Sequence, residues 1–195
     1  MEKKKLFTVK DIVGTALLLA LEIVLQLLGS IIPTPVTMNL SLIPITIGAI
    51  IFGPISGAFL GLTCGLILIL TPNTVTLFMS ISPFGTVLTC LVKTALAGLA
   101  AGFIYLPFKK KGMNLVGAII ASIVVPLLNT FVFSIFCLIF FMDGLRAQGF
   151  AITDYWSLFT VFIGFNFLIE IVSNTVICPM ISKAIEMRTT PNQKA

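Results

Sequence analysis

The sequence predicts an all-α membrane protein with six transmembrane helices and both termini in the cytoplasm. Of its 195 residues, 58% are hydrophobic and only 10% are charged, whereas soluble domains carry about 25% charged residues. A helix needs about 20 apolar residues to cross a roughly 30 Å hydrocarbon core, so the chain is long enough for about six crossings. A transmembrane β-barrel is disfavoured, because the run from Ile43 to Leu70 does not alternate between apolar and polar residues.

The first half of the chain contains three predicted helices. The first covers residues 11–28 and leads into a proline-rich stretch, 31–35, whose fixed backbone angles suit an ordered loop. A long apolar run follows, and Gly53-Pro54 divides it, because proline removes a helical hydrogen bond and glycine permits a tight reversal. This run is therefore predicted as two helices, 40–52 and 54–70, the first of them short for a full crossing.

The second half of the chain contains three more apolar segments long enough for helices. They cover residues 84–106, 114–141 and 157–186. Polar, turn-rich stretches at 71–83 and 142–156 are predicted as loops. The chain ends in a polar cytoplasmic tail, 187–195, of which residues 189–193 are expected to be disordered.

The orientation follows from the positions of the 12 basic residues. Four lie in the first ten positions, three at 109–111 and three at 183–194, which leaves Lys93 inside a helix and only Arg146 for the opposite side. Because basic loops stay in the cytoplasm, both termini are predicted to be cytoplasmic. The loops at 29–39, 71–83 and 142–156 then lie outside, where they can cover a site in the outer half of the bundle.

The composition also excludes several functions. The net charge of +5 comes from basic clusters beside apolar segments, as membrane topology requires, so no nucleic-acid partner is expected. There is no histidine and no P-loop motif, so histidine chemistry is excluded and any ATP hydrolysis belongs to other subunits. The four cysteines lie in apolar stretches without CxxC spacing and are predicted to pack in the interior, and neither a metal nor a cofactor is expected.

Two predicted helices carry small residues at four-residue spacing. Ala16 and Ala20 lie one turn apart on one face of the first helix, where small side chains let another helix approach closely. Gly57, Gly61 and Gly65 form a similar stripe in the third helix. The glycine stripe is interpreted as internal packing, whereas the alanine pair suits either internal packing or a partner.

Three ionisable residues lie at membrane depth, where each costs on the order of 2.5–3.5 kcal/mol unless it is paired or hydrated. They are Glu22, Lys93 and Glu170. Glu22 and Gln26 share a helical face roughly 120° from the face of Ala16 and Ala20. The first helix therefore offers a smooth face to a partner and a polar face to its own bundle.

Amide and charged side chains in the last three predicted helices are the candidate substrate-binding residues. They are Lys93, Asn129, Asn166, Glu170 and Asn174. The last three recur every four residues and form a stripe about 12 Å long on one helical face. Two interpretations stay open. Either Lys93 pairs with Glu170 or Glu22 and the amides bond to one another, or the group lines a pocket for a polar solute.

Four segments, taken in order, carry a family resemblance. They are Ala16-Leu17-Leu18-Leu19-Ala20, Met38-Asn39-Leu40-Ser41-Leu42-Ile43-Pro44, Phe52-Gly53-Pro54-Ile55-Ser56-Gly57 and Lys93-Thr94-Ala95-Leu96-Ala97-Gly98. Together with the predicted topology, they resemble the substrate-binding S component of energy-coupling factor (ECF) vitamin transporters. The resemblance covers nearly the whole chain, and the Gly-Pro reversal after a short second helix carries the most weight.

The resemblance implies a non-enzymatic subunit that binds a water-soluble vitamin with high affinity for an ATP-driven importer. Ala16 and Ala20 would dock on a transmembrane T component, which is coupled to two cytoplasmic ATPases. Pantothenate is the best guess for the vitamin, because Lys93 or Arg146 can neutralise its carboxylate. Riboflavin, which needs a flat apolar slot, or another small vitamin is the alternative within the family. A membrane scaffold and a membrane-embedded enzyme are the alternatives outside it.

Overall fold

The computed structural model describes residues 9–31, 38–152, 154–158, 160 and 164–189. Every regular element in this described part is helical, which confirms the all-α prediction. The elements are α1 (Val9–Ile31), α2 (Leu42–Phe52), α3 (Pro54–Ile69), the π-helical segment η1 (Thr74–Met79), α4 (Pro83–Lys110), α5 (Asn114–Phe140), α6 (Met142–Ala147), α7 (Tyr155–Leu158) and α8 (Gly164–Thr189). Most of the predicted 31–35 loop and of the 187–195 tail lies outside the described residues.

Among the described residues, four helices are long and apolar enough to cross a membrane. Their candidate spans are Asp11–Ser30, Pro83–Lys110, Asn114–Phe140 and Asn166–Ala184. The apolar helices α2 and α3 are shorter, with 11 and 16 residues. At 1.5 Å per residue they extend roughly 17 and 24 Å, which is less than a hydrocarbon core of about 30 Å.

Helix α2 forms the centre of the bundle. All of its residues from Leu42 to Ile50 are buried, and it contacts α1, α3, α4, α5 and α8. A helix that is hydrophobic all round needs such complete cover. It ends at Gly53, whose φ of 98° is open to glycine but strained for other residues, and Pro54 begins α3. The Gly-Pro reversal therefore places α3 against the helix that precedes it.

The glycine stripe of α3 packs directly against the backbone of α4. A Cβ atom built on Gly65 would lie 2.6 Å from the Cys90 carbonyl oxygen, and one built on Gly57 would lie 2.5 Å from the Gly98 carbonyl oxygen. Gly61 meets the Thr94 carbonyl in the same way. These contacts confirm that the stripe serves internal packing, since only glycine lets two helices approach so closely.

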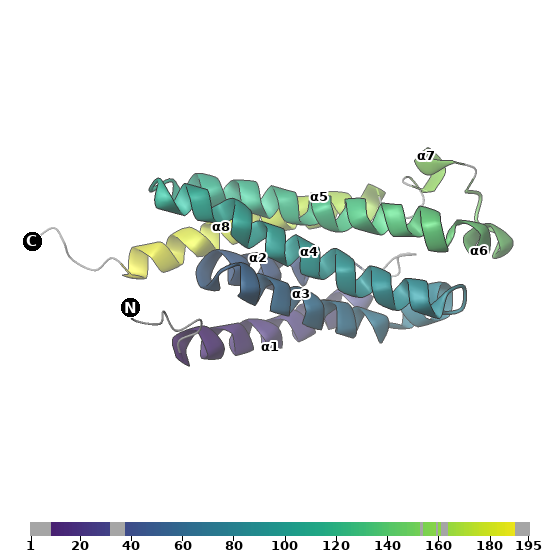
Figure 1. Cartoon of the computed structure of the whole chain (residues 1–195), viewed down its shortest axis with the longest axis horizontal. Helices are drawn as coiled ribbons and strands as arrows, with labels where there is room; N and C mark the ends of the chain where they lie inside the picture. Colours follow the sequence, from purple (N-terminus) through teal and green to yellow (C-terminus); the bar gives the residue numbers. More distant parts are fainter. Residues whose placement is uncertain (1–8, 32–37, 153, 159, 161–163, 190–195) are drawn as a thin grey trace, which may run out of the picture.

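The two ends of the bundle differ in structure (Figure 1). The start of α1, the end of α8 and the turn between α4 and α5 lie together at one end, and η1, α6 and α7 lie at the other. The sequence predicts loops over 71–83 and 142–156, but these stretches contain η1, α6 and α7. Their apolar side chains pack inward, as Phe78 and Leu145 do, and this burial favours short helical turns over open loops.

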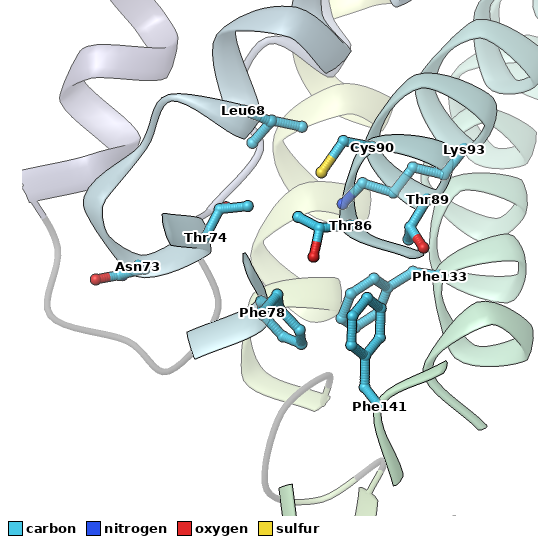
Figure 2. Close-up of a pocket in the computed structure, with 10 residues that line it drawn as sticks. All are labelled: Leu68, Asn73, Thr74, Phe78, Thr86, Thr89, Cys90, Lys93, Phe133 and Phe141. Carbon is cyan, nitrogen blue, oxygen red and sulfur yellow. The ribbon is translucent and has the colours of Figure 1, made fainter. Parts of the chain in front are cut away.

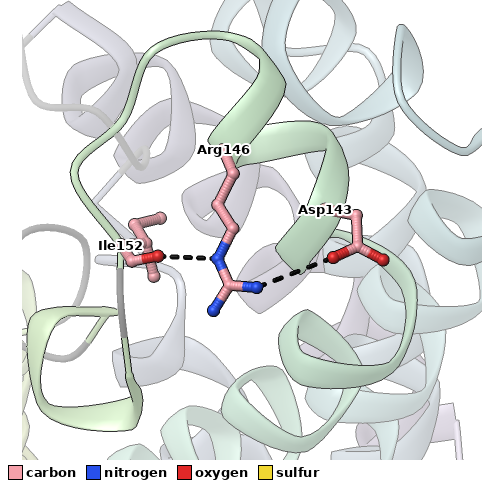
Figure 3. A network of polar contacts seen from close by, with 3 residues as sticks. All are labelled: Asp143, Arg146 and Ile152. Carbon is pink, nitrogen blue, oxygen red and sulfur yellow. Dashed lines mark hydrogen bonds and ion pairs between the residues drawn. The ribbon is translucent and has the colours of Figure 1, made fainter.

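A cluster of apolar side chains closes the end of the bundle that carries η1 and α6. It contains Phe78, Phe133, Cys137, Phe141, Leu145 and Ile152. The Arg146 side chain on α6 holds the segment after this helix, because its Nε donates a hydrogen bond to the Ile152 carbonyl oxygen at 2.7 Å (Figure 3). Asp143 lies 3.7 Å from the same guanidinium group.

Candidate functional site

One face of α4 supplies the polar wall of the candidate site. Thr86, Thr89 and Lys93 are three and four residues apart, so they lie above one another on that face. The helix begins with Pro83, and the hydroxyl of Ser82 accepts a hydrogen bond from the Gly85 amide at 3.2 Å. This N-cap fixes where α4 begins and therefore where its polar face lies along the bundle.

The polar face of α4 borders a cavity that three rings of the aromatic cluster also line (Figure 2). Ten residues line it: Leu68, Asn73, Thr74, Phe78, Thr86, Thr89, Cys90, Lys93, Phe133 and Phe141. The cavity volume is about 20 Å³, which is room for about one water molecule. A solute larger than a water molecule does not fit in this cavity as the side chains stand.

Lys93 lines the cavity and is only 7% exposed. Its side chain extends along α4 toward Thr86 (Figure 2), and Nζ lies 4.8 Å from the centroid of the Phe133 ring. A cation–π contact of this kind compensates part of the cost of burial. Of the two interpretations left open by the sequence, a direct ion pair of Lys93 with Glu170 or Glu22 is not formed in this structure, because no described carboxylate lies within 4.0 Å of its ammonium group.

The other two membrane-depth carboxylates hold the bundle together. Glu170 on α8 accepts a hydrogen bond from the Asn39 backbone amide at 2.9 Å, which ties α8 to the chain just before α2. On α1, Glu22 Oε1 lies 3.1 Å from the Thr63 hydroxyl of α3, and Gln26 Oε1 lies 3.0 Å from the Ser41 hydroxyl. Both α1 side chains are fully buried, as the predicted polar face requires.

Asn174 belongs to an internal network and does not line the cavity. Its Nδ2 donates to the Thr46 hydroxyl at 3.0 Å and to the Ser122 carbonyl oxygen at 2.8 Å. Its Oδ1 accepts a hydrogen bond from the Cys178 thiol, with 2.9 Å between the two atoms. With both amide hydrogens in use, this side chain connects α8 to α2 and α5 and has no hydrogen left to donate to a solute.

Asn129 and Asn166 are buried but lie outside the cavity lining. Asn129 is 4% exposed and lies one turn before Phe133 on α5. Its Oδ1 has no hydrogen-bond partner among the described residues. Of the five predicted substrate-binding residues, only Lys93 therefore lines the closed cavity, and Asn129 retains an acceptor that a solute or a water molecule can use.

Several cavity residues were not predicted as site residues. Thr86 and Thr89 share the face of Lys93 at helical spacing, and that pattern could have identified them. Phe78, Phe133 and Phe141 carry no such signal, because they are three of 17 phenylalanines in an apolar chain. Only the fold shows that η1, α5 and the start of α6 bring these rings together.

The described part of the chain is an all-helical, apolar bundle with four helices long enough to cross a membrane and a small cavity bordered by a buried ammonium group, which is the architecture of a membrane protein. The comparison with known families agrees with this class. The chain belongs to the family described as ECF transporter, substrate-specific component, whose sequence model matches residues 10–182. No curated protein and no solved structure matches the chain significantly.

Membership of this family confirms the resemblance found in the sequence. The chain is a substrate-specific subunit of a membrane transporter, and the family is not a family of enzymes. Membership also implies a small-molecule substrate and association with a T component and ATPases.

Proposed function

We propose that this protein is the high-affinity binding subunit for a water-soluble vitamin that carries a carboxylate, with pantothenate as the preferred substrate. The observation that carries the proposal is the buried ammonium group of Lys93, which faces the cavity and has no described carboxylate within 4.0 Å. A charge at membrane depth is expensive unless it is paired or hydrated. A substrate carboxylate would complete the pair that the protein leaves open.

Arg146 is the less suitable partner for that carboxylate. Its guanidinium group lies near Asp143 and the Ile152 carbonyl, and its side chain is 44% exposed. A carboxylate bound there would gain less, because solvent screens exposed ion pairs. Lys93 is buried and therefore offers the stronger interaction.

The aromatic rings of the cavity favour a small flexible substrate over riboflavin. The ring of Phe78 meets those of Phe133 and Phe141 at interplanar angles of 82° and 74°. Phe78 therefore forms no parallel wall with either of these rings, and a flat isoalloxazine ring would need such a slot. Pantothenate, a short chain with a carboxylate at one end, requires no such slot.

The same proposal includes the topology and the partner surface. Six crossings with both termini in the cytoplasm would place η1 and α6 outside, and the basic turn after α4 would face the T component and the ATPases. Ala16 and Ala20 are exposed on α1, on a different face from the buried Glu22 and Gln26. Ala16 also borders an apolar groove of about 440 Å³ between α1 and α3, which suits a helix of the T component.

Binding of pantothenate to the purified protein tests the substrate assignment. We expect a dissociation constant below about 10 µM, since a scavenging carrier must bind strongly. Lys93→Gln should weaken binding roughly 100-fold, because the substrate carboxylate is then left without its partner. Lys183→Gln is the matched control, since that lysine is exposed near the end of α8 and should not alter binding.

A ligand lacking the carboxylate makes the test specific. The neutral primary amide of pantothenate should bind the wild type weakly, and Lys93→Gln should change its affinity little, because the charged pair is already absent. If Lys93→Gln binds pantothenate as tightly as the wild type, the assignment of the carboxylate to this lysine is wrong. If no vitamin in a panel of carboxylates binds the wild type, the proposed substrate class is wrong.

A further inference from the structure

The hydroxyl groups of the cavity have a feature that restricts the substrate further. Each uses its hydrogen within the protein, so each has only oxygen lone pairs to offer. Thr86 Oγ1 donates to the Ser82 carbonyl oxygen at 2.8 Å, and Thr89 Oγ1 donates to the Gly85 carbonyl oxygen at 2.6 Å. Both acceptors lie four residues earlier in the chain, at the start of α4.

The Thr74 hydroxyl also uses its hydrogen within the protein, in a bond to the neighbouring Thr71. Its hydroxyl lies 2.8 Å from that of Thr71, and Thr71 Oγ1 donates to the Leu68 carbonyl oxygen at 2.7 Å. A hydroxyl carries a single hydrogen, so Thr74 must be the donor in the bond between the two threonines. The three threonines that line the cavity therefore all present acceptors.

Lys93 complements these acceptors. An ammonium group has three hydrogens to donate and no lone pair to accept with, and Lys93 contacts the Phe133 ring from one side. The α4 face thus offers a cationic donor at one end and two neutral acceptors, Thr89 and Thr86, one and two turns before it. Thr74 adds a third acceptor from η1.

We propose that the substrate has one anionic group for Lys93 and, within a few bonds of it, at least two O–H or N–H groups that donate to Thr74, Thr86 and Thr89. This inference rests on the proposed function and specifies the substrate class of the same site. Polyhydroxy acids and acyl amino acids that also carry a hydroxyl group belong to this class. Carboxylates whose other polar atoms are only ether, ester or ketone oxygens are excluded, because two acceptors that face each other repel and lose their water.

Three threonine-to-valine variants test the inference. Valine keeps the shape of threonine and removes only the hydroxyl. Thr94→Val is the matched control, because Thr94 lies on the same helix, is buried and donates to the carbonyl oxygen of Cys90 at 2.7 Å, yet does not line the cavity. All three variants lose the same internal hydrogen bond, so their thermal unfolding midpoints should agree.

The measurement is equilibrium binding of pantothenate and of its ether with both hydroxyls methylated. Thr86→Val and Thr89→Val should each weaken pantothenate binding about five- to tenfold, whereas Thr94→Val should leave it unchanged. The methylated ether should bind the wild type at least tenfold more weakly than pantothenate does. That difference should shrink in the double variant Thr86→Val with Thr89→Val, because the acceptors for the hydroxyls are gone.

The possible results separate this inference from the proposed function. If the wild type binds pantothenate and the ether equally well, or if the two cavity variants behave like Thr94→Val, the acceptor wall has no role in recognition and the inference is overturned. If the wild type binds neither of these probes nor any other carboxylate vitamin, the proposed function fails and this inference fails with it.

Discussion

At the scale of single residues, some polar side chains at membrane depth are hydrogen-bonded to neighbouring helices, whereas others face the cavity and can contact a substrate. Asn174 belongs to the first group, because its amide is hydrogen-bonded to Thr46, the Ser122 carbonyl and Cys178. Lys93 remains available to the cavity. The division follows from the neighbours of each side chain, and it decides which substitutions change stability and which change binding.

Asn174→Ala should therefore destabilise the protein without weakening substrate binding. Removing the amide leaves Thr46 and the Ser122 carbonyl without this donor, and interhelical hydrogen bonds in membranes contribute about 0.6–1.7 kcal/mol each. Thermal unfolding in detergent should show a lower midpoint, and the dissociation constant of pantothenate should change less than twofold. Val172→Ala, on the exposed side of α8, should alter neither quantity. If Asn174→Ala has a normal unfolding midpoint but no longer binds pantothenate, Asn174 contacts the substrate after all.

The sequence was sufficient to identify Lys93 but not to separate it from Asn174. Both lie in apolar helices, and the cost of placing a polar group at membrane depth marks each as exceptional. Whether such a group faces a cavity or another helix depends on residues far away in the chain, such as Thr46 for Asn174 and Phe133 for Lys93. Helical spacing gives the face of a residue on its own helix but not the partner that this face meets.

At the scale of elements, the contact between α3 and α4 positions the polar face of the cavity. Gly57, Gly61 and Gly65 let the two backbones touch, and Thr86, Thr89 and Lys93 lie on the α4 side of the same pair. This packing could be predicted from sequence, because a glycine every four residues in an apolar helix indicates a close helix contact.

Gly61→Ala should disrupt that contact. The added methyl group would overlap the Thr94 carbonyl and the Ala95 Cα atom, which belong to backbone and cannot rotate away. Overpacking of this kind typically costs 1–3 kcal/mol, so the unfolding midpoint should fall. Substrate affinity should fall as well, because α4 is displaced. Leu62→Ala, an exposed position on α3, is the control, and equal stability of the two variants would contradict the packing argument.

The elements at the end of the bundle that carries η1 and α6 were the hardest to predict. The stretches 71–83 and 142–156 contain serine, glycine, proline and charged residues that usually form loops, yet they contain η1, α6 and α7. Their fold depends on burying Phe78, Leu145 and Ile152 together. That cluster joins residues more than 60 positions apart, and local composition has no information on such a contact.

Arg146→Gln should loosen this end of the bundle. The guanidinium Nε bond to the Ile152 carbonyl at 2.7 Å holds the segment after α6 against the cluster above the cavity. Without this hydrogen bond, pantothenate should enter and leave the cavity faster. We expect a dissociation rate roughly three- to tenfold higher in stopped-flow measurements. Asp143→Asn removes the 3.7 Å ion pair and keeps the Nε bond, so its effect should be smaller. Equal rates for the wild type and Arg146→Gln would show that the segment does not limit exchange.

At the scale of the whole molecule, α1 has two different faces. Glu22 and Gln26 attach one face to α2 and α3, and Ala16 and Ala20 leave the other face smooth and exposed. The polar attachment, together with the close packing of Gly14 on Phe52 and of Gly29 on Met38, holds α1 in the bundle without using Ala16 and Ala20 for internal packing. A subunit that works with a separate T component needs such a face, because direct helix contact in a membrane depends on small side chains.

Ala16→Trp combined with Ala20→Trp should therefore abolish vitamin uptake in cells that carry the complete transporter, while the purified variant still binds pantothenate with unchanged affinity. Two indole rings on the smooth face would hold a partner helix away, but they point away from Lys93 and the cavity. Co-purification with the T component and the ATPases measures docking directly. Val172→Trp, on the exposed surface of α8, provides a control of equal bulk and should preserve both uptake and co-purification. If the double variant still co-purifies with its partners, α1 is not the docking helix, and the smooth face serves only the lipid.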